Sequence, residues 1–185
     1  MKRLLFILSL CTYCQISAQA SVEKSIWNIQ TGTLGIWANN ESRLSNSVAL
    51  RTEAGLDAGL FMGGIYDDLG FFLMPVVTIE PRWYYNLRKR GEKSKNISGN
   101  SANFLSLKTS YHPDWFIISN KDNVDIISQI SIIPTWGIRR QIGKHFNYEA
   151  GFGIGYRYIF AKNAGFENDD QEAAVNLHLR IGYRF

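Results

Sequence analysis

The clearest pattern in this sequence is an alternation of apolar and polar residues with a period of two. It is most regular over residues 174–185, AVNLHLRIGYRF. A period of two places alternate side chains on opposite faces of a β-strand. One face of this segment carries Val175, Leu177, Leu179, Ile181, Tyr183 and Phe185, and the other carries Asn176, His178, Arg180 and Arg184.

The same alternation predicts five more strands, over residues 48–60, 71–85, 104–117, 124–139 and 146–160. Residues 22–44 are less regular, and we divide them into two short strands at Gly32-Thr33. Pro75 and Pro81 fall inside one strand, where they predict bulges or gaps in the ladder because each removes a hydrogen-bond donor. With an even strand number, and eight as the smallest usual size for a bacterial barrel, the pattern predicts about eight strands.

The polar faces of these strands are highly charged. Unpaired charges are strongly disfavoured in the core of a soluble sheet, and the opposite faces are too apolar for water. Lipid on the apolar face and paired acids and bases in a narrow lumen remove both difficulties. The sequence thus predicts an all-β, antiparallel up-and-down transmembrane β-barrel with these lumen residues: Arg51, Glu53, Asp57, Glu80, Arg82, Lys108, His112, Asp114, Asp125, Arg139, Glu149, Arg157, His178, Arg180 and Arg184.

Side chains nearly fill a lumen of eight strands, so an open pore is not expected. The three glycines Gly151, Gly153 and Gly155 recur with the strand period, and we expect them to leave room in the lumen for long side chains from neighbouring strands. Large aromatic residues fall mostly near the expected strand ends, as interfacial girdles would. They are Trp27, Trp37, Trp83, Tyr85, Tyr111, Trp115, Trp136, Tyr156 and Tyr158.

The first twenty residues have the features of a secretory signal peptide. Lys2 and Arg3 precede an apolar run, and Ala18-Gln19-Ala20 is a small-x-small cleavage site. Both cysteines lie in this segment, so a mature chain of residues 21–185 has no disulfide and no thiolate metal site. Its 165 residues are enough for one domain, and no internal repeat divides them. That chain has eighteen basic and sixteen acidic residues, a net charge of +2 that gives little support for an anionic partner.

Two polar segments connect expected strands. Residues 86–103 carry Arg88, Lys89, Arg90, Lys93 and Lys95 and are interpreted as a solvated basic connection on the periplasmic side. Binding to lipid phosphates or peptidoglycan is the alternative. The loops around Asp67, Lys121 and Asp169 are then external, and the acidic residues 167–172 lack the ligand spacing of a calcium loop.

Ser110, His112 and Asp114 invite comparison with a hydrolase triad. They share one strand face, but neighbours on such a face are ~7 Å apart, whereas a proton relay needs contacts near ~3 Å. We therefore expect no enzyme activity, catalytic residues, cofactor or metal. Nucleic acid is not an expected partner of an exported chain.

Four segments carry a resemblance to a known family. They are PRWYYNLRKR (81–90), SYHPDWFIISN (110–120), GKHFNYEAGFGIGYRY (143–158) and LHLRIGYRF (177–185). The chain resembles small outer-membrane β-barrel proteins of the OmpA/OmpX transmembrane-domain type, and more closely an uncharacterised Bacteroidetes-type group of such barrels. The resemblance implies location in the cell outer membrane, contact with its lipids, and recognition of Tyr183 and Phe185 by the barrel assembly machinery. The chain ends with the barrel, so no peptidoglycan-binding domain is expected.

The expected function is that of a non-enzymatic integral outer-membrane barrel with a structural, adhesive or envelope-integrity role. A channel or carrier for a small solute, using the lumen charges, is the main alternative. A lipid-modifying outer-membrane enzyme is the third.

Overall fold

The computed structural model describes residues 20–63, 66–122 and 124–185. The predicted signal peptide, apart from Ala20, lies outside the described residues. Most of the described residues lie in β-strands. Its strands are β1 (Ser25–Gly32), β2 (Gly35–Arg43), β3 (Val48–Gly63), β4 (Tyr66–Trp83), β5 (Asn103–His112), β6 (Ile118–Ser119), β7 (Gln129–Ile142), β8 (Phe146–Ile159) and β9 (Asp170–Arg184).

The strands form one antiparallel sheet that closes into a ring. Neighbours in sequence pair with each other from β1 to β5, then β5 pairs with β7, β7 with β8 and β8 with β9, and β9 returns to β1. The two-residue strand β6 pairs only with β4, at Phe72 and Leu73, and lies outside this ring. The predicted all-β antiparallel fold is confirmed. The division of residues 22–44 is also confirmed, because β1 and β2 form a hairpin that closes at Gly32 and Gly35.

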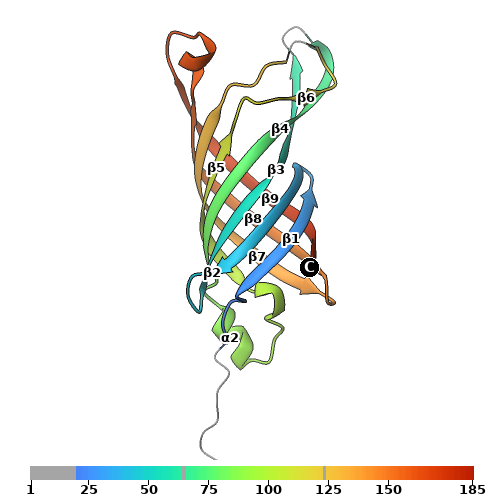
Figure 1. Ribbon diagram of the computed structural model, residues 1–185, viewed down its shortest axis with the longest axis vertical. Helices are drawn as coiled ribbons and strands as arrows, with labels where there is room; N and C mark the ends of the chain where they lie inside the picture. The colour runs from blue at the N-terminus through green and yellow to red at the C-terminus, as the bar shows by residue number, and fades with distance from the viewer. Residues whose placement is uncertain (1–19, 64–65, 123) are drawn as a thin grey trace, which may run out of the picture.

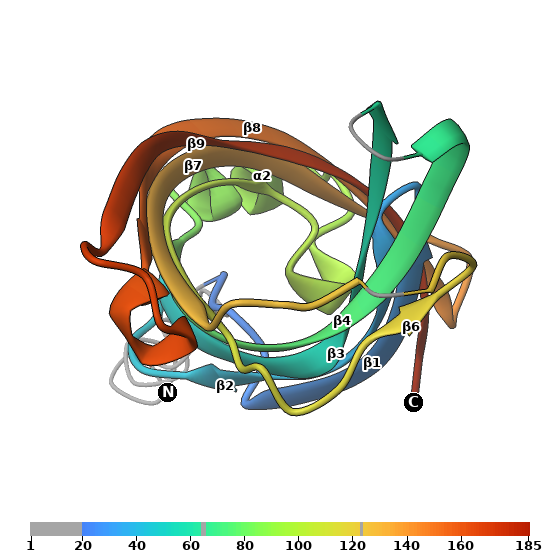
Figure 2. The same ribbon diagram turned by 90° about the horizontal axis from the view of Figure 1, so that it is seen from above.

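The two ends of the ring differ (Figure 1). One end, here called the helical end, carries the connection from β4 to β5, which contains helix α2 (Leu87–Glu92) and the 3₁₀ turn η1 (Ser98–Asn100). The opposite end, called the loop end, carries the connections between β3 and β4, β5 and β7, and β8 and β9, the last with the 3₁₀ turn η2 (Ala161–Ala164). Seen along the ring, the segment with α2 lies across the far opening (Figure 2).

Several strand limits differ from the prediction. The strand expected over 104–117 ends at His112, because Pro113 has no N–H with which to continue a ladder. The strand expected from Val124 begins at Gln129. The loop expected at 63–68 is largely replaced by the long β3–β4 hairpin, of which residues 64 and 65 lie outside the described part.

Of the two prolines predicted to interrupt the ladder, only Pro81 coincides with a gap. Strand β4 pairs with β5 at Ile79 and again at Arg82, leaving a gap at Glu80 and Pro81. The ladder between β3 and β4 continues past both Pro75 and Pro81. A proline lacks one N–H, so each of these residues can lose a ladder hydrogen bond on only one side of β4.

The expected reason for three glycines is wrong. A Cβ at Gly155 would lie 2.2 Å from the main-chain oxygen of Ile132, and one at Gly153 would lie 2.4 Å from that of Pro134. These glycines therefore allow close approach of the β7 and β8 backbones instead of leaving room for long side chains. Gly137 does make room for a side chain, since a Cβ there would lie 2.4 Å from the Phe104 ring.

Burial is reversed relative to a soluble sheet. Along β9 the apolar residues from Val175 to Ile181 are exposed and the alternate polar residues are buried. A small apolar core exists only at the helical end of the described structure, where the cap covers the ring. It consists of Val22, Ala49, Tyr84, Leu87, Ala102 and Phe104. No helix in the described residues is long and apolar enough to cross a membrane.

Candidate functional site

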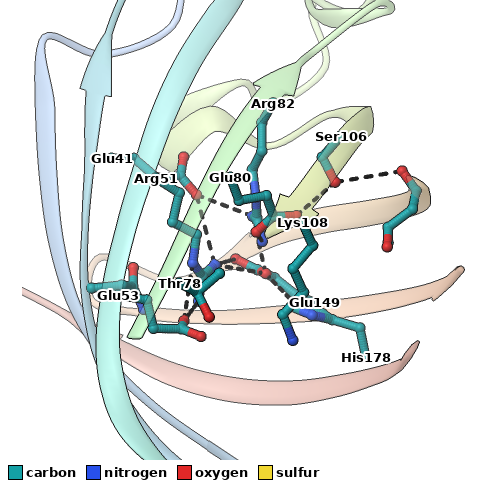
Figure 3. Close-up of polar contacts among 12 residues, drawn as sticks. Glu41, Arg51, Glu53, Thr78, Glu80, Arg82, Ser106, Lys108, Glu149 and His178 are labelled. Carbon is teal, nitrogen blue, oxygen red and sulfur yellow. Dashed lines mark hydrogen bonds and ion pairs between the residues drawn. The ribbon is translucent and has the colours of Figure 1, made fainter. Parts of the chain in front are cut away.

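Charged side chains from several strands around the ring meet in its middle (Figure 3). Inward positions on β2, β3, β4, β7 and β8 carry Glu41, Arg51, Arg82, Arg139 and Glu149, all at most 1% exposed. The register places opposite charges directly across from each other: Glu41 faces Arg51, and Arg139 faces Glu149. Opposite charges at such positions attract, so the ladder register itself favours this pairing.

Two carboxylates hold the three guanidinium groups. Arg139 Nη1 lies 2.7 Å from Glu41 Oε1 and 2.8 Å from Glu149 Oε1. Arg82 Nη1 lies 3.1 Å from Glu41 Oε1 and 3.1 Å from Glu149 Oε2. Arg51 Nη1 lies 3.0 Å from Glu149 Oε2. Both glutamates are thus shared, and no single ion pair can be removed without affecting the others.

A second layer balances the charge. Glu53 accepts hydrogen bonds from Arg51 and from Arg180, the latter at 2.5 Å. Glu80 pairs with Arg82 at 2.9 Å and accepts a bond from Ser106 at 2.6 Å. We call the whole set the charge cluster: Glu41, Glu53, Glu80, Glu149, Arg51, Arg82, Arg139 and Arg180.

Four acids and four bases make the charge cluster neutral overall. Two further polar side chains complete it: Gln30 Nε2 lies 3.1 Å from Glu149 Oε1, and His178 Nε2 lies 2.6 Å from Glu149 Oε2. Buried charges are tolerated when paired and hydrogen-bonded in this way. The arrangement therefore fills and stiffens the ring.

The cap at the helical end is joined to the charge cluster through Glu41. The Tyr84 hydroxyl donates to Glu41 Oε2 at 2.8 Å, and Asn100 Nδ2 donates to the same oxygen at 3.0 Å. Burial, followed by the Glu41 carboxylate, raises the pKa of Tyr84 well above its ordinary value, so the hydroxyl keeps its proton. The basic residues predicted to be solvated are mostly so, since Arg88, Lys89, Lys93 and Lys95 are exposed.

The structure brings together most of the predicted lumen residues but separates others. Asp57 pairs with His112 at 2.8 Å nearer the loop end, and Lys108 Nζ lies 3.4 Å from Asn176 Oδ1. Four further predicted residues also lie outside the charge cluster, although Arg157 lines the interior cavity together with Lys108. Asp114 and Asp125 are exposed, Arg157 pairs with Glu172 at 2.7 Å, and Arg184 pairs with Glu23 at 2.5 Å.

Some of the aromatic residues predicted to lie near strand ends are on the outer face, and others are not. Trp27, Trp83 and Trp136 are about half exposed or more on the outer face, as predicted for a girdle. Trp37 is 4% exposed and faces the interior, where the Arg180 guanidinium lies 3.6 Å from its ring centroid. Tyr183 and Phe185 lie on the outer face with ring centroids 5.4 Å apart.

Glu41 contacts more of the cap than any other member of the charge cluster, but it is not among the lumen residues predicted from the sequence. It falls in the polar run NNESRLSNS, which was interpreted as the end of a strand. The signal was present, because Trp37, Asn39 and Glu41 continue one parity of β2 and are all buried. Asn28, Gln30 and Asn147 were missed for the same reason, being uncharged inward residues.

The triad-like residues do not form a relay. Ser110 Oγ lies 2.8 Å from Thr78 Oγ1, His112 contacts Asp57, and Asp114 is exposed. Among the described residues there is also no group of three or more His, Cys, Asp or Glu placed to hold a metal ion.

Comparison with models of known protein families found no match, and neither curated protein sequences nor solved structures gave one. The function must therefore be argued from the closed sheet, its reversed burial and its charged interior.

Proposed function

We propose that this chain is an integral outer-membrane protein whose ring of strands is a transmembrane β-barrel with a structural, adhesive or envelope-integrity role. The observation that carries the proposal is the reversed burial. Neutralised charges occupy the interior while large apolar side chains cover the outside. Soluble monomers rarely expose contiguous apolar patches larger than a few hundred Å², whereas here exposed apolar side chains recur along the outer faces of the strands, as at Val175, Leu177 and Leu179 of β9.

The strand lengths and aromatic positions support the same proposal. Strands β7, β8 and β9 have 14, 14 and 15 residues, and a tilted transmembrane strand needs ~9–11. Near the helical end, the Trp136 indole N–H donates to the Tyr85 hydroxyl at 2.9 Å, and Trp83 packs edge-on against Tyr85. Amphipathic aromatic residues of this kind favour the boundary between hydrocarbon and water.

A filled interior favours a structural role over conduction. The charge cluster crosses the ring, and the cap lies across its helical end. We assign the helical end to the periplasm and the loop end to the exterior. Recognition of Tyr183 and Phe185 by the assembly machinery remains a prediction.

Membrane fractionation combined with heat-modifiable gel mobility tests the proposal. A folded barrel should fractionate with the outer membrane and migrate differently before and after boiling. A freely soluble protein with one mobility would overturn the membrane assignment.

Planar-bilayer recording tests the structural role against the channel alternative. The intact protein should give no stable single-channel steps. Steps that disappear when Arg51 or Glu80 is replaced would favour a channel or carrier instead.

A further inference from the structure

The wall of the ring is incomplete above the β1–β2 hairpin. The ladder between β2 and β3 ends at Asp57, followed by one hydrogen bond from Ala58 N to Leu34 O at 2.7 Å. The ladder between β1 and β9 ends at Arg180. Toward the loop end, the described residues of β3 beyond Ala58 and of β9 before Arg180 have ladder partners on one side only, β4 and β8 respectively. Figure 1 shows the two long strands diverging above the short hairpin. We call this gap the side opening.

The side opening falls within the depth that the proposed membrane would occupy. The β9 residues beside it include Val175, Leu177 and Leu179, whose side chains are 57%, 58% and 57% exposed on the outer face. Open sheet edges are not tolerated against hydrocarbon, but they are tolerated where they line a polar cavity. The edges of β3 and β9 therefore need such a cavity or an occupant.

A cavity of about 240 Å³ lies at this position. Its lining includes Leu34 of the hairpin turn, Gly59 of β3 and Leu177 of β9, which border the side opening. It also includes Lys108, His112 and Arg180 from the interior. The cavity thus connects the side opening with Lys108 and His112 and with Arg180 of the charge cluster.

Lys108 is the cation in this cavity that lacks a close counter-charge. Arg180 is paired with Glu53, and Asp57 is engaged by His112 and by the Trp37 indole N–H at 2.6 Å. The remaining lining cation, Arg157, is paired with Glu172. Within the described part of the chain, no carboxylate lies within 4.0 Å of Lys108 Nζ, whose recorded partner is the uncharged Asn176. An ammonium has three hydrogen-bond donors, so Lys108 can donate hydrogen bonds to an anionic group in the cavity.

We propose that the side opening is a lateral portal that binds a single-chain anionic amphiphile, with its acidic head group at Lys108 and its chain passing between β3 and β9 into the lipid. The cavity volume is consistent with one hydrocarbon chain whose far end lies outside the cavity. Pockets that enclose a whole drug-sized ligand have ~300–1,000 Å³, so this cavity holds a head group and the first part of a chain. The inference rests on the proposed membrane location.

Trp37 provides a local reporter, because it lines the cavity and is shielded from the outer face. The other tryptophans, Trp27, Trp83, Trp115 and Trp136, are exposed and can be replaced by phenylalanine. The full chain with Trp37 alone is placed in phosphatidylcholine nanodiscs and titrated with a fatty acid brominated in the first half of its chain. We expect saturable quenching of Trp37, at least tenfold stronger than with the matching brominated alcohol.

Variants of Lys108 then test the head-group contact. K108Q should weaken the apparent affinity for the acid at least tenfold and make it similar to that for the alcohol, whereas K108R should stay within about threefold of the parent. K93Q, which removes an exposed charge from the cap, should change nothing. Heat-modifiable mobility verifies that each variant is folded. A brominated lysophosphatidate distinguishes a phosphate from a carboxylate head group.

Several results would overturn the portal. They are equal quenching by acid and alcohol, quenching that does not depend on Lys108, competition by free acetate or inorganic phosphate at the concentrations of the amphiphile, and cross-linking of two copies through the β3 and β9 edges with Trp37 inaccessible. A chain with Trp136 alone, in nanodiscs of brominated phosphatidylcholine, separates the two proposals. Absence of quenching there contradicts the membrane location, whereas quenching of Trp136 without quenching of Trp37 contradicts only the portal.

Discussion

The Tyr84 hydroxyl donates a hydrogen bond to Glu41 Oε2 at 2.8 Å, and this contact joins the cap to the interior of the ring. Tyr84 follows β4 directly and is 1% exposed. Its aromatic ring packs edge-on against Phe104, with centroids 5.7 Å apart. Tyr84 therefore contacts both the small apolar core and the charge cluster. The cap is therefore fixed both by burial and by a charge-assisted hydrogen bond.

Tyr84→Phe should loosen the cap. Loss of a hydrogen bond to a buried carboxylate costs ~1.5–3 kcal/mol, and the remaining ring keeps its packing. Urea unfolding in detergent micelles should show this loss, and limited proteolysis should cut faster near the exposed Arg88 and Lys89. Tyr85→Phe is the matched control, because the Tyr85 hydroxyl bonds to Trp136 at the outer surface. Equal effects of the two substitutions would contradict a special role for the Tyr84 contact.

Glu41→Gln should destabilise the protein strongly. The substitution keeps the shape of the side chain but leaves Arg82 and Arg139 with one fewer buried carboxylate. Breaking a buried ion pair by removing one partner costs ~3–5 kcal/mol. Glu92→Gln removes an exposed carboxylate from an i,i+4 pair with Arg88 and should change the free energy of unfolding by less than about 0.5 kcal/mol. A mild effect of Glu41→Gln would mean that the charge cluster does not stabilise the ring.

Phe152→Arg tests the outer face. Phe152 lies in the middle of β8 and is 49% exposed. An arginine at the bilayer midplane of a barrel costs ~2–4 kcal/mol, so the folded, membrane-inserted fraction should fall. Phe166→Arg makes the same change in the connection between β8 and β9, where the side chain is also exposed, and should leave folding into vesicles unchanged. If both variants fold equally well, the outer face is not in contact with lipid.

Gly137→Ala should force the Phe104 ring out of place. The new Cβ would lie 2.4 Å from that ring, which is fully buried and carries the Arg82 guanidinium 4.3 Å from its centroid. Overpacking of this kind costs ~1–3 kcal/mol. In a protein that already carries Phe104→Leu, Gly137→Ala should lower the free energy of unfolding by less than it does in the parent, because the two sites are in contact. Additive effects in a double-mutant cycle would show that Gly137 is not needed to accommodate the Phe104 side chain.

Local alternation was enough to predict much of the fold. The faces of β8 and β9, from Phe146 to Ile159 and from Asp170 to Arg184, follow directly from a period of two. The inward positions of Arg51, Glu149 and Arg180 follow from the same parity. Which charges meet could not be predicted, since Arg51 and Glu149 are 98 residues apart and their contact depends on the closure of the ring.

Three features required the folded chain. Glu41 was hidden in a polar run whose strand character depends on pairing with β1 and β3. The cap was expected to be a solvated connection, but Leu87 and Ala102 complete an apolar core with the distant Val22. The side opening depends on the difference in length between the β1–β2 hairpin and its neighbours, which short-range pattern does not reveal.

The short β1–β9 ladder also makes the seam between the first and last strands a mechanically weak part of the ring. Five residue pairs, from Asn28–Arg184 to Gly32–Arg180, and one hydrogen bond from Phe185 N to Trp27 O join this seam, whereas the ladder between β8 and β9 extends from Phe146–Tyr183 to Ile159–Asp170. The interrupted ladder between β4 and β5 also has five pairs. Local opening has its lowest free energy where few contacts must break. The seam between the first and last strands is therefore one of the places where amide hydrogens should exchange early. Because it joins strands that are far apart in the sequence, it should also close late during folding.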